Sequence, residues 1–247
     1  MTDGKVSIVI PTYNRLDLLQ RCVASIRRYT SATCEIVVVD NASTDGTPDW
    51  CRREGLTLVS LPRNAGFPVA CNKGLRVATG DTLVLLNNDT VATPNWLDNM
   101  AAALRSSPEV GIVGPVTNFA SGSQQVNYPF ENLDEFQRIA AEVNVIDPRK
   151  WKKVERIVGI CFVFRRELME QIGLLDERFS PGHYEDDDYC LRARLHGYSL
   201  IVCHDCLIYH EGSASFKQEG QEQQQLLVER NYRMFMDKWH LDPRAFI

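Results

Sequence analysis

The densest group of ionisable side chains in the sequence is an acidic run, Glu185-Asp186-Asp187-Asp188. Consecutive carboxylates repel one another and raise each other's pKa unless a cation or a positive dipole compensates them. If the run begins a helix, the positive end of the helix macrodipole accounts for two or three of the four acids. A carboxylate beyond those is a candidate general base, which would take a proton from an acceptor hydroxyl. The run therefore has both a structural and a catalytic interpretation.

Two further acids follow apolar runs that are typical of buried strands. Asp40 ends the run 36–39, and Asp89 follows the run 82–86. Runs without alternation fit parallel strands that are covered on both faces. Ligands of open parallel sheets bind beyond the carboxyl ends of the strands. Singly, each acid is better explained as a turn or cap former, but together they favour a site for a nucleotide and a divalent metal.

Other candidate binding residues lie near a predicted helix start and at a predicted strand end. Gly66, in Asn64-Ala65-Gly66-Phe67, would let the backbone approach a ligand, and a helix N-terminus favours anions; a plain loop-to-helix junction explains this segment equally well. His210 could complete a metal site, although a lone histidine is more often a hydrogen-bonded structural residue. The sequence contains neither G-x-G-x-x-G after the first strand nor G-x-x-x-x-G-K-[ST], which disfavours dinucleotide oxidoreductases and P-loop NTPases.

The elements that must position these residues alternate regularly as far as residue 116. The apolar patterns predict strands at 6–10, 36–39, 56–61, 82–86 and 111–116, with helices at 16–28, from 45, 68–77 and 94–104. Beyond this point the pattern is irregular: it predicts helices at 133–143, 167–172, 186–196 and 221–239, and strand character at 154–165 and 200–209. We predict one α/β domain over residues 1–247, with a nucleotide-binding half (1–116) and a less regular half (117–247).

Composition narrows the function classes. The 27 Lys and Arg residues against 32 Asp and Glu residues give a formal net charge of −5, which argues against a protein that coats nucleic acid phosphates. No apolar run reaches about 18 residues, the length that a transmembrane helix needs. The first residues, Met1 to Lys5, do not read as a secretory signal. These features predict a cytoplasmic protein without a nucleic acid partner, and they leave peripheral association with the inner face of a membrane open.

Taken in order, the motifs resemble those of the family 2 glycosyltransferases, which have the GT-A fold and transfer sugars with inversion. The resemblance runs from about Lys5 to Ser213 and rests on the segments 6–15, 37–47, 64–67 and 72–74. Further on, 85–90 (Leu-Leu-Asn-Asn-Asp-Thr) is similar to the family's acidic metal-binding motif, 184–188 to its catalytic-base motif, and 209–213 to its metal-binding histidine segment. The Leu-Asn-Asn-Asp-Thr form resembles the rhamnosyltransferase-like branch.

The resemblance assigns roles residue by residue. Asp186 would be the general base, with Asp187 and Asp188 as register alternatives and Glu185 beside them. Asp89 and His210 would bind a divalent cation, Mn²⁺ or Mg²⁺, and the nitrogen ligand favours Mn²⁺. Asn88 stands where other forms of the motif carry an acid. The nucleotide sugar would be bound by Pro11, Thr12, Tyr13, Arg15, Asp40, Asn41, Asn64, Gly66, Asn72, Lys73, Asn87 and Asn88.

The resemblance also implies a fold and a reaction. The fold would be a single Rossmann-like GT-A domain, with a mostly parallel central sheet flanked by helices and an irregular acceptor-side half. The enzyme, of class EC 2.4, would move a hexosyl or deoxyhexosyl group from a nucleotide-diphosphate sugar to a hydroxyl of a saccharide, lipid-linked or protein acceptor, in the synthesis of cell-surface polysaccharide or glycoconjugate. Two alternatives stay open. A sugar-nucleotide nucleotidyltransferase would need a glycine-rich basic loop where residues 11–15 offer only Arg15, and a catalytically inactive homologue would only bind nucleotide sugar.

Overall fold

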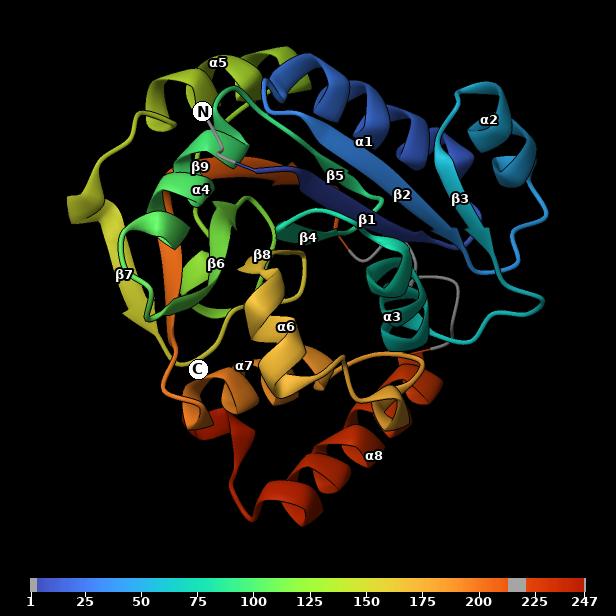
Figure 1. The fold of residues 1–247 in the computed structure, drawn as a ribbon, viewed down its shortest axis with the longest axis vertical. Coiled ribbons are helices and arrows are strands. Elements are labelled where there is room, and N and C mark those ends of the chain that lie inside the picture. The colour runs from blue at the N-terminus through green and yellow to red at the C-terminus, as the bar shows by residue number, and fades with distance from the viewer. Residues whose placement is uncertain (1–3, 213–220, 247) are drawn as a thin grey trace.

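The computed structural model describes residues 4–212 and 221–246. The first part of the chain alternates strands and helices as the sequence predicts (Figure 1). Its elements are β1 (Val6–Thr12), α1 (Leu16–Tyr29), β2 (Cys34–Asp40), α2 (Thr47–Arg53), β3 (Thr57–Ser60), α3 (Phe67–Val77) and β4 (Thr82–Leu86). β1 pairs in parallel with both β2 and β4, and β2 pairs in parallel with β3.

The second part of the chain completes the same sheet. Its elements are β5 (Thr90–Val91), α4 (Trp96–Arg105), β6 (Val110–Thr117), α5 (Leu133–Val143), β7 (Trp151–Val154), β8 (Cys161–Arg165), α6 (Arg166–Ile172), α7 (Glu185–Leu195), β9 (Ser199–His210) and α8 (Gln221–Trp239). Within the described residues the strand order is β3-β2-β1-β4-β8-β6-β9-β5, with β7 paired to β9. β8 is antiparallel to its neighbours β4 and β6. The predicted α/β fold is confirmed, with a mixed sheet.

Three local differences from the sequence prediction bear on the site. The stretch 154–165, predicted as continuous strand character, divides into β7 and β8, and the intervening loop 155–160 reaches the site described below. The stretch 200–209, predicted as one or two short strands, is the single strand β9, which ends at His210. The two-residue strand β5, which was not predicted, pairs Thr90 with His210. Such a short pairing leaves no periodic signal in the sequence.

Both faces of the sheet are covered, which explains the unalternating apolar runs. Ile8 and Ile10 of β1 pack with the buried residues of α1 and α4. Val9, between them, belongs to the core on the opposite face, which also contains buried residues of α3, α5, α6 and α7. α3 approaches the sheet so closely that a Cβ on Gly74 would lie 2.2 Å from Val9 Cγ1. Two cores on opposite faces therefore fix the sheet edge from which the loops project.

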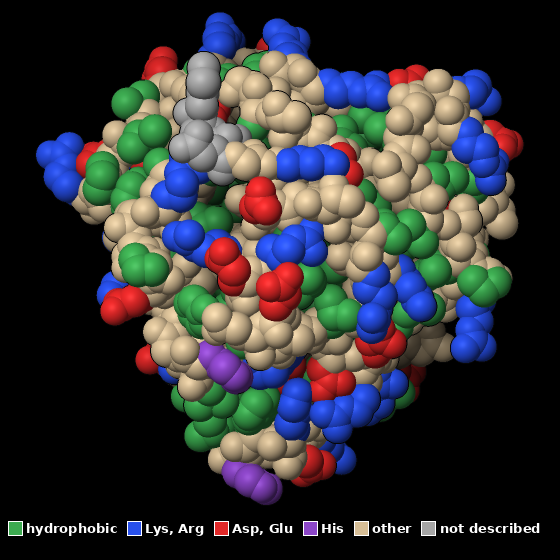
Figure 2. Space-filling model, in the orientation of Figure 1, with side chains coloured by type: hydrophobic (Ala, Val, Ile, Leu, Met, Phe, Trp, Pro, Cys, Tyr) green, Lys and Arg blue, Asp and Glu red, His purple; other side chains and the backbone are tan. Residues whose placement is uncertain are grey.

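α8 lies at the bottom of the molecule in Figure 1, beyond α6 and α7. A small third cluster of buried apolar residues holds it: Phe235 of α8 packs with Phe179 and with Leu191 of α7. On the face shown in Figure 2, basic and acidic side chains of the described residues are interspersed. Among the described residues, no helix combines the length and the apolar character that a membrane span requires.

Candidate active site

A cavity of about 850 Å³ lies beyond the carboxyl ends of β1 and β4 and beside the first turn of α7. Most of the site residues predicted from the sequence line it, although they come from distant parts of the chain. Its lining includes Pro11, Thr12, Tyr13, Asn41, Asn64, Gly66, Asn87, Asn88, Asp89, Glu185, Asp186, Asp187 and His210. The fold therefore brings two acidic motifs, a histidine and the predicted nucleotide loops to one hollow.

The wall at the end of β1 is built by loops that are tied to one another. Tyr13 is 40% exposed and presents its ring to the cavity. The next residue, Asn14, joins the loop after β2: its backbone N–H donates to Ser43 Oγ at 2.7 Å, and its side-chain oxygen accepts from Thr44 N at 2.9 Å. These contacts hold the backbone of Asn14 in a left-handed conformation with φ of 54°. These hydrogen bonds between the two loops fix the position of the backbone that carries Tyr13.

A second part of this wall is the loop that enters α3. Asn41 holds it from β2, since its side chain accepts from Ala65 N at 2.8 Å and donates to the Gly66 carbonyl at 3.2 Å. Gly66 has a φ of 91°, and a Cβ there would lie 2.6 Å from Pro181 Cα. Both the positive φ and the close approach require glycine. The Phe67 N–H then donates to the Pro181 carbonyl at 2.8 Å, so Gly66 joins the loop before α3 to the loop before α7.

Four predicted nucleotide-binding residues do not line the cavity. Asp40 is 2% exposed and accepts a hydrogen bond from Ser43 N at 3.1 Å. Arg15 pairs with Asp17 at the start of α1, and this hydrogen bond raises the pKa of Arg15 despite a small opposing effect of burial. The other two lie on α3: Lys73 is exposed, and Asn72 is buried.

Asn72 has a different set of partners from the one predicted. Its amide donates to the Leu175 carbonyl at 2.9 Å and to Glu177 Oε1 at 3.0 Å, and its oxygen accepts from Leu175 N at 2.9 Å. It therefore joins α3 to the segment between α6 and α7. Neither Asn72 nor Lys73 is therefore part of the candidate site, as neither lines the cavity.

Asp89 and His210 form a buried pair at one corner of the cavity. His210 Nε2 lies 3.2 Å from Asp89 Oδ1, and Nδ1 lies 2.7 Å from the Phe119 carbonyl. A carbonyl can only accept, so Nδ1 carries the proton and Nε2 is the nitrogen that could bind a metal. Burial lowers the pKa of His210, but the hydrogen bond to Asp89, its charge and the Phe119 carbonyl outweigh burial, and the net pKa is raised.

The two asparagines that precede Asp89 differ in their surroundings. Asn88 donates to Thr12 Oγ1 at 2.8 Å, so this side chain ties the end of β4 to the end of β1. Asn87 Oδ1 is buried and has no hydrogen-bond partner among the described residues. A buried oxygen without a partner costs free energy unless a ligand or water satisfies it. Asn87 therefore offers the cavity a free oxygen beside the Asp89–His210 pair.

The acids of α7 differ in their contacts, and the carboxylate of Asp186 accepts hydrogen bonds from two backbone N–H groups. Its Oδ2 accepts from Gly159 N at 2.9 Å and its Oδ1 from Asp187 N at 3.0 Å. Asp187 lies 2.6 Å from Arg156 Nε in an ion pair whose N–H is not aligned as a hydrogen bond. Burial and the neighbouring Asp186 charge raise the pKa of Asp187 well above its usual range, against the opposing effect of Arg156.

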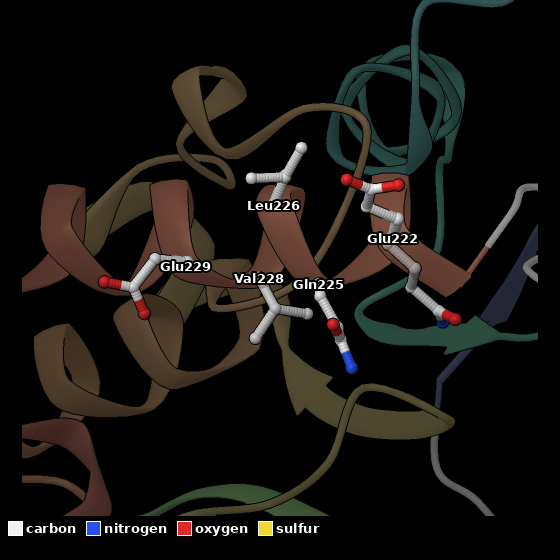
Figure 3. A pocket seen from close by; sticks show the side chains of 6 residues that line it. Glu222, Gln225, Leu226, Val228 and Glu229 are labelled. Atoms are coloured by element: carbon white, nitrogen blue, oxygen red, sulfur yellow. The ribbon is translucent and has the colours of Figure 1, made fainter.

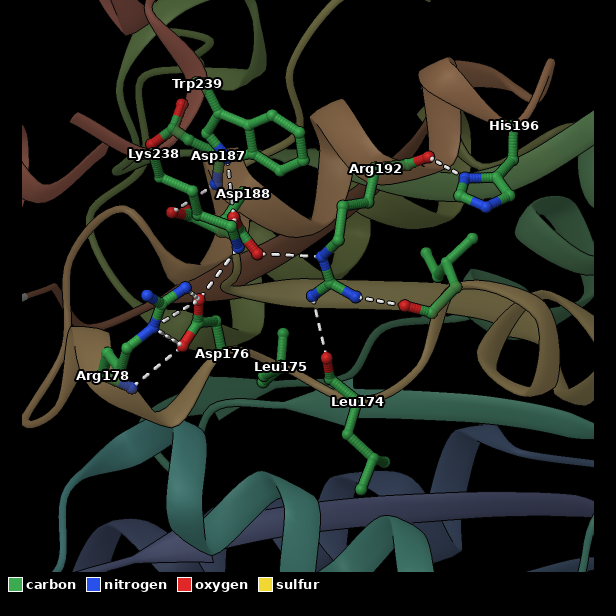
Figure 4. Close-up of polar contacts among 12 residues, drawn as sticks. Leu174, Leu175, Asp176, Arg178, Asp187, Asp188, Arg192, His196, Lys238 and Trp239 are labelled. Atoms are coloured by element: carbon green, nitrogen blue, oxygen red, sulfur yellow. Dashed lines mark hydrogen bonds and ion pairs between the residues drawn. The ribbon is translucent and has the colours of Figure 1, made fainter. Parts of the chain in front are cut away.

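Asp188 does not line the cavity and lies instead in a network of charged side chains (Figure 4). It is fully buried. Its Oδ2 accepts from Arg192 Nε at 2.9 Å, and its Oδ1 accepts from Trp239 Nε1 at 2.8 Å and contacts Lys238 Nζ. Lys238 also pairs with Asp176 at 2.8 Å. Asp188 thus fastens the end of α8 to α7.

The end of the chain supplies a wall that the sequence did not predict. Val228 of α8, together with Pro243 and Arg244 of the 3₁₀ helix Pro243–Phe246, lines the cavity. Figure 3 shows that Val228 and Leu226 point to opposite sides of α8, and Leu226 is 65% exposed. Val228 therefore lines the cavity, and it also borders, together with Leu226, a second hollow along α8.

Other lining residues were also missed from the sequence. They include Arg156 and Gly159 of the loop between β7 and β8, and Phe119 after β6. Neither segment carries a motif, because each reaches the cavity only through the order of strands in the sheet. The predicted histidine segment 209–213 ends on Ser213, which lies outside the described residues.

Comparison with known proteins gives a consistent family assignment. The model of the family described as Glycosyl transferase family 2 matches residues 7–173, more than half of the chain. The mannosyltransferase PcManGT from Pyrobaculum calidifontis, solved in complex with GDP-Man and Mn²⁺, superposes with a TM-score of 0.65 at 26% identity. That match covers 87% of this chain and 60% of the mannosyltransferase chain.

Two curated relatives are similar along most of this chain. The O-antigen biosynthesis protein RfbC of Myxococcus xanthus is 29% identical over 85% of this chain and 18% of its own length. Glycosyltransferase AglE of Haloferax volcanii is 26% identical over 83% of this chain and 66% of its own length. The chain thus spans less than a fifth of the first and 66% of the second. The likeness to a rhamnosyltransferase branch stays a prediction.

Proposed function

This chain belongs to glycosyl transferase family 2, and from that premise we propose that it moves a sugar from a nucleotide-diphosphate sugar to an acceptor hydroxyl, with inversion at the anomeric carbon. The observation that carries the proposal is the meeting, in one cavity, of the buried Asp89–His210 pair and the backbone-held carboxylate of Asp186. The Asp89–His210 pair could bind a diphosphate through a metal ion, and the carboxylate of Asp186 could act as a general base. The fold and the family support a transferase with these two functions.

The Asp89–His210 corner fits a divalent cation. A carboxylate and an imidazole nitrogen converge there, the second imidazole nitrogen is oriented by the Phe119 carbonyl, and such outer hydrogen bonds are typical of metal-bound histidine. Among the described residues no three His, Cys, Asp or Glu side chains are placed so that they could hold a metal ion together, and the substrate's phosphates would supply further ligands, as magnesium and manganese sites allow. When bound, Mn²⁺ or Mg²⁺ would offset the charge of the departing nucleoside diphosphate.

Asp186 is our proposed general base. Two backbone N–H groups fix the orientation of its carboxylate in the cavity wall. Asp187 is paired with Arg156, and Asp188 is paired with charged side chains that join α7 to α8. These ion pairs favour Asp186 over Asp187 and Asp188 as the general base. In the reaction, Asp186 takes the proton of the acceptor hydroxyl as that oxygen bonds to the anomeric carbon. The nucleoside diphosphate departs from the opposite face with the electrons of the broken C–O bond.

The wall residues would then divide the substrates between them. Tyr13 can stack on the base, and Asn64 and the backbone at Gly66 line the same cavity. His183 of the loop before α7 and Arg244 of the C-terminal wall also line it, and we assign these two to the acceptor. A saccharide, lipid-linked or protein acceptor, in the synthesis of cell-surface polysaccharide or glycoconjugate, agrees with the O-antigen and glycosyltransferase names of the relatives.

The test combines donor binding with transfer. We expect one of UDP-, dTDP- or GDP-sugars to stabilise the protein in a thermal-shift assay with Mn²⁺ or Mg²⁺ and not with EDTA, since a ligand that binds the folded state raises its stability. Asp89→Ala should abolish this metal-dependent shift. If the shift survived in Asp89→Ala, the metal site would lie elsewhere.

The base is tested with the donor and a mixture of saccharide and lipid-linked acceptors. Asp186→Asn should keep donor binding within about threefold and reduce transfer at least roughly a hundredfold, the typical effect of losing a general base. Unchanged transfer would contradict the assignment. Release of pyrophosphate from a nucleoside triphosphate would instead indicate a nucleotidyltransferase, and donor binding without transfer to any acceptor would indicate an inactive homologue.

A further inference from the structure

The Asp89–His210 corner lies where the strand pairing of the sheet ends. β6 and β9 pair in parallel as far as Thr117 and Ile208, which is two residues before His210. On its other side, His210 pairs with Thr90 of the two-residue strand β5, and the N–H of the next residue donates to the Asp89 carbonyl at 3.0 Å. β5 therefore ties the two proposed metal ligands to each other at an edge of the sheet.

The side chain of Asn118 continues the pairing at the point where the backbone of β6 stops. Its Oδ1 accepts from the His210 N–H at 2.9 Å, and its Nδ2 donates to the His210 carbonyl at 3.0 Å. A side-chain amide has the same donor and acceptor as a peptide group, so Asn118 stands beside His210 as a neighbouring strand would. The hydroxyl of the buried Thr117 also donates to Asn118 Oδ1, at 3.2 Å, which holds the amide in this orientation.

The residue after Asn118 holds the ring of the same histidine. The Phe119 carbonyl accepts from His210 Nδ1 at 2.7 Å, and the centroids of the two rings are 5.9 Å apart. Two consecutive residues at the end of β6 therefore contact the N–H, the carbonyl and the imidazole of His210. Because the backbone and Nδ1 are both held, Nε2 is directed at the Asp89 carboxylate, 3.2 Å away.

Asn118 itself does not line the cavity, so it is not placed to touch a bound nucleotide or sugar. A metal ion requires its ligand atoms within a few tenths of an ångström of their ideal distances. Loss of an outer contact that orients a metal-bound histidine typically weakens metal binding about 10–100-fold. An effect of Asn118 on the metal would therefore pass through the position of His210.

We propose that Asn118 is a positioning residue for the divalent cation: its side-chain amide fixes the backbone of His210 at the end of β9 and thereby sets how strongly the Asp89–His210 corner holds the metal. The inference rests on the proposed metal-dependent function and deepens it. It assigns a role to a residue that belongs to none of the sequence motifs and that contacts the site only through the ladder between β6 and β9.

The same strand offers a matched control. Asn144 Oδ1 accepts from the Leu207 N–H at 2.7 Å, and its Nδ2 donates to the Leu207 carbonyl at 3.3 Å. Asn144 is fully buried and does not line the cavity. It thus makes the same pair of hydrogen bonds to the backbone of β9, three residues before His210, at a position that offers no metal ligand. Its removal tests what a general loosening of β9 does.

The measurement is calorimetry of UDP, GDP and dTDP on the whole chain, in Mn²⁺ and in EDTA, well below the Tm of every variant. The quantity compared is the metal-dependent gain, which is the Kd in EDTA divided by the Kd in Mn²⁺ for the diphosphate that the wild type binds. Asn118→Ala should reduce this gain at least about tenfold and leave the Kd in EDTA within about twofold. Asn144→Ala should lower Tm and leave both values within about threefold.

The outcomes separate the inference from the function beneath it. An undiminished gain in Asn118→Ala would overturn the positioning role while the proposed function stands. An equal reduction in Asn144→Ala would overturn it as well, because β9 would then be loosened as a whole. If Mn²⁺ gives the wild type no gain with any of the three diphosphates, the proposed function and the inference fall together.

A milder pair of variants keeps the test valid if an alanine variant does not fold. Asn118→Asp and Asn144→Asp keep the side-chain size and the acceptor and lose the N–H donor. The metal-dependent gain should fall at least about threefold in Asn118→Asp and stay unchanged in Asn144→Asp. If Asn118→Asp instead increased the gain, its added negative charge would matter more than the position of His210, and the proposal would be wrong.

A double-mutant cycle identifies the route by which Asn118 acts. His210→Ala removes the imidazole and with it the group that Asn118 is proposed to position. Adding Asn118→Ala to His210→Ala should therefore change the remaining gain by no more than about twofold. A tenfold loss in both backgrounds would show that Asn118 affects the metal independently of His210, which contradicts the inference.

Discussion

Asp188→Asn should destabilise the protein while sparing the chemistry of the cavity, the reverse of what Asp186→Asn should do. Asp188 is fully buried, and its two carboxylate oxygens meet Arg192, Lys238 and Trp239 (Figure 4). The asparagine is nearly the same size, so no cavity forms. It removes the negative charge, however, and turns an amide N–H₂ group toward side chains that can only donate. The prediction therefore isolates electrostatics from packing.

The expected loss of stability depends on the contacts that Arg192 and Lys238 keep in the variant. Removing one member of a buried ion pair typically costs about 3–5 kcal/mol, because the other charge is left buried without compensation. Here Arg192 keeps its hydrogen bonds to the Ile172 and Leu174 carbonyls, and Lys238 keeps Asp176 at 2.8 Å. We therefore take the lower end, a loss of about 3 kcal/mol. For a chain of this size that corresponds to a fall in Tm of roughly 6–12 °C.

The assay is thermal and urea unfolding of the whole chain, together with transfer measured well below the Tm of the variant. Asp237→Asn is the matched control, because Asp237 makes the same chemical change next to Lys238 while its side chain is exposed, and it should shift Tm by no more than about 2 °C. If Asp188→Asn left Tm within that margin and reduced transfer a hundredfold, the structural role of Asp188 would be refuted and Asp188 would return as a candidate base.

Three further predictions concern the walls of the cavity. Gly66→Ala should cost about 2 kcal/mol or more and weaken donor binding, because its Cβ would meet Pro181 at a positive φ; denaturation and donor titration check this. Asn231→Ala should cost about 2–3 kcal/mol and raise acceptor KM, since its buried amide donates to three carbonyls of 179–183, including His183; unchanged KM would contradict it. Arg156→Met should lower kcat at least about tenfold with little change in donor affinity, because Asp187 loses its cation; a steady-state comparison with Arg156→Lys tests the charge.

Strand and helix positions in the first half could be predicted because local pattern and tertiary environment agree there. The apolar runs of β1 and β4 and the second half of β2 are buried on both faces, and the helices turn apolar residues toward the sheet. In the second half the pattern is weaker because β8 is inserted between β4 and β6, a neighbour relation that chain order does not encode. The loop 155–160, which precedes β8, lines the cavity because β8 takes this place in the sheet.

The sequence predicted some residues of the candidate site and missed others, again because chain order does not show which segments become neighbours. Asp89, His210 and the acids of α7 belong to motifs, and motifs are local. Asn72 stood in a motif as well, yet its hydrogen bonds go to Leu175 and Glu177, since the spacing of a motif does not say which way a helix turns its polar side chain. Arg156 and Arg244 have no motif, and only their place beside Asp187 and in the C-terminal wall gives them a role.

The sequence by itself determined the α/β class, the alternation of the first half and the family resemblance, because apolar periodicity and short motifs are properties of neighbouring residues. Only the tertiary structure decided what each of four consecutive acids does. Asp186 meets backbone N–H groups, Asp187 meets Arg156, and Asp188 meets Lys238 and Trp239 from the far end of the chain. Oε2 of Glu185 is buried without a hydrogen bond among the described residues. Identical side chains differ in charge and function when their surroundings differ in solvent, dipoles and counter-charge, and those surroundings exist only in the folded chain.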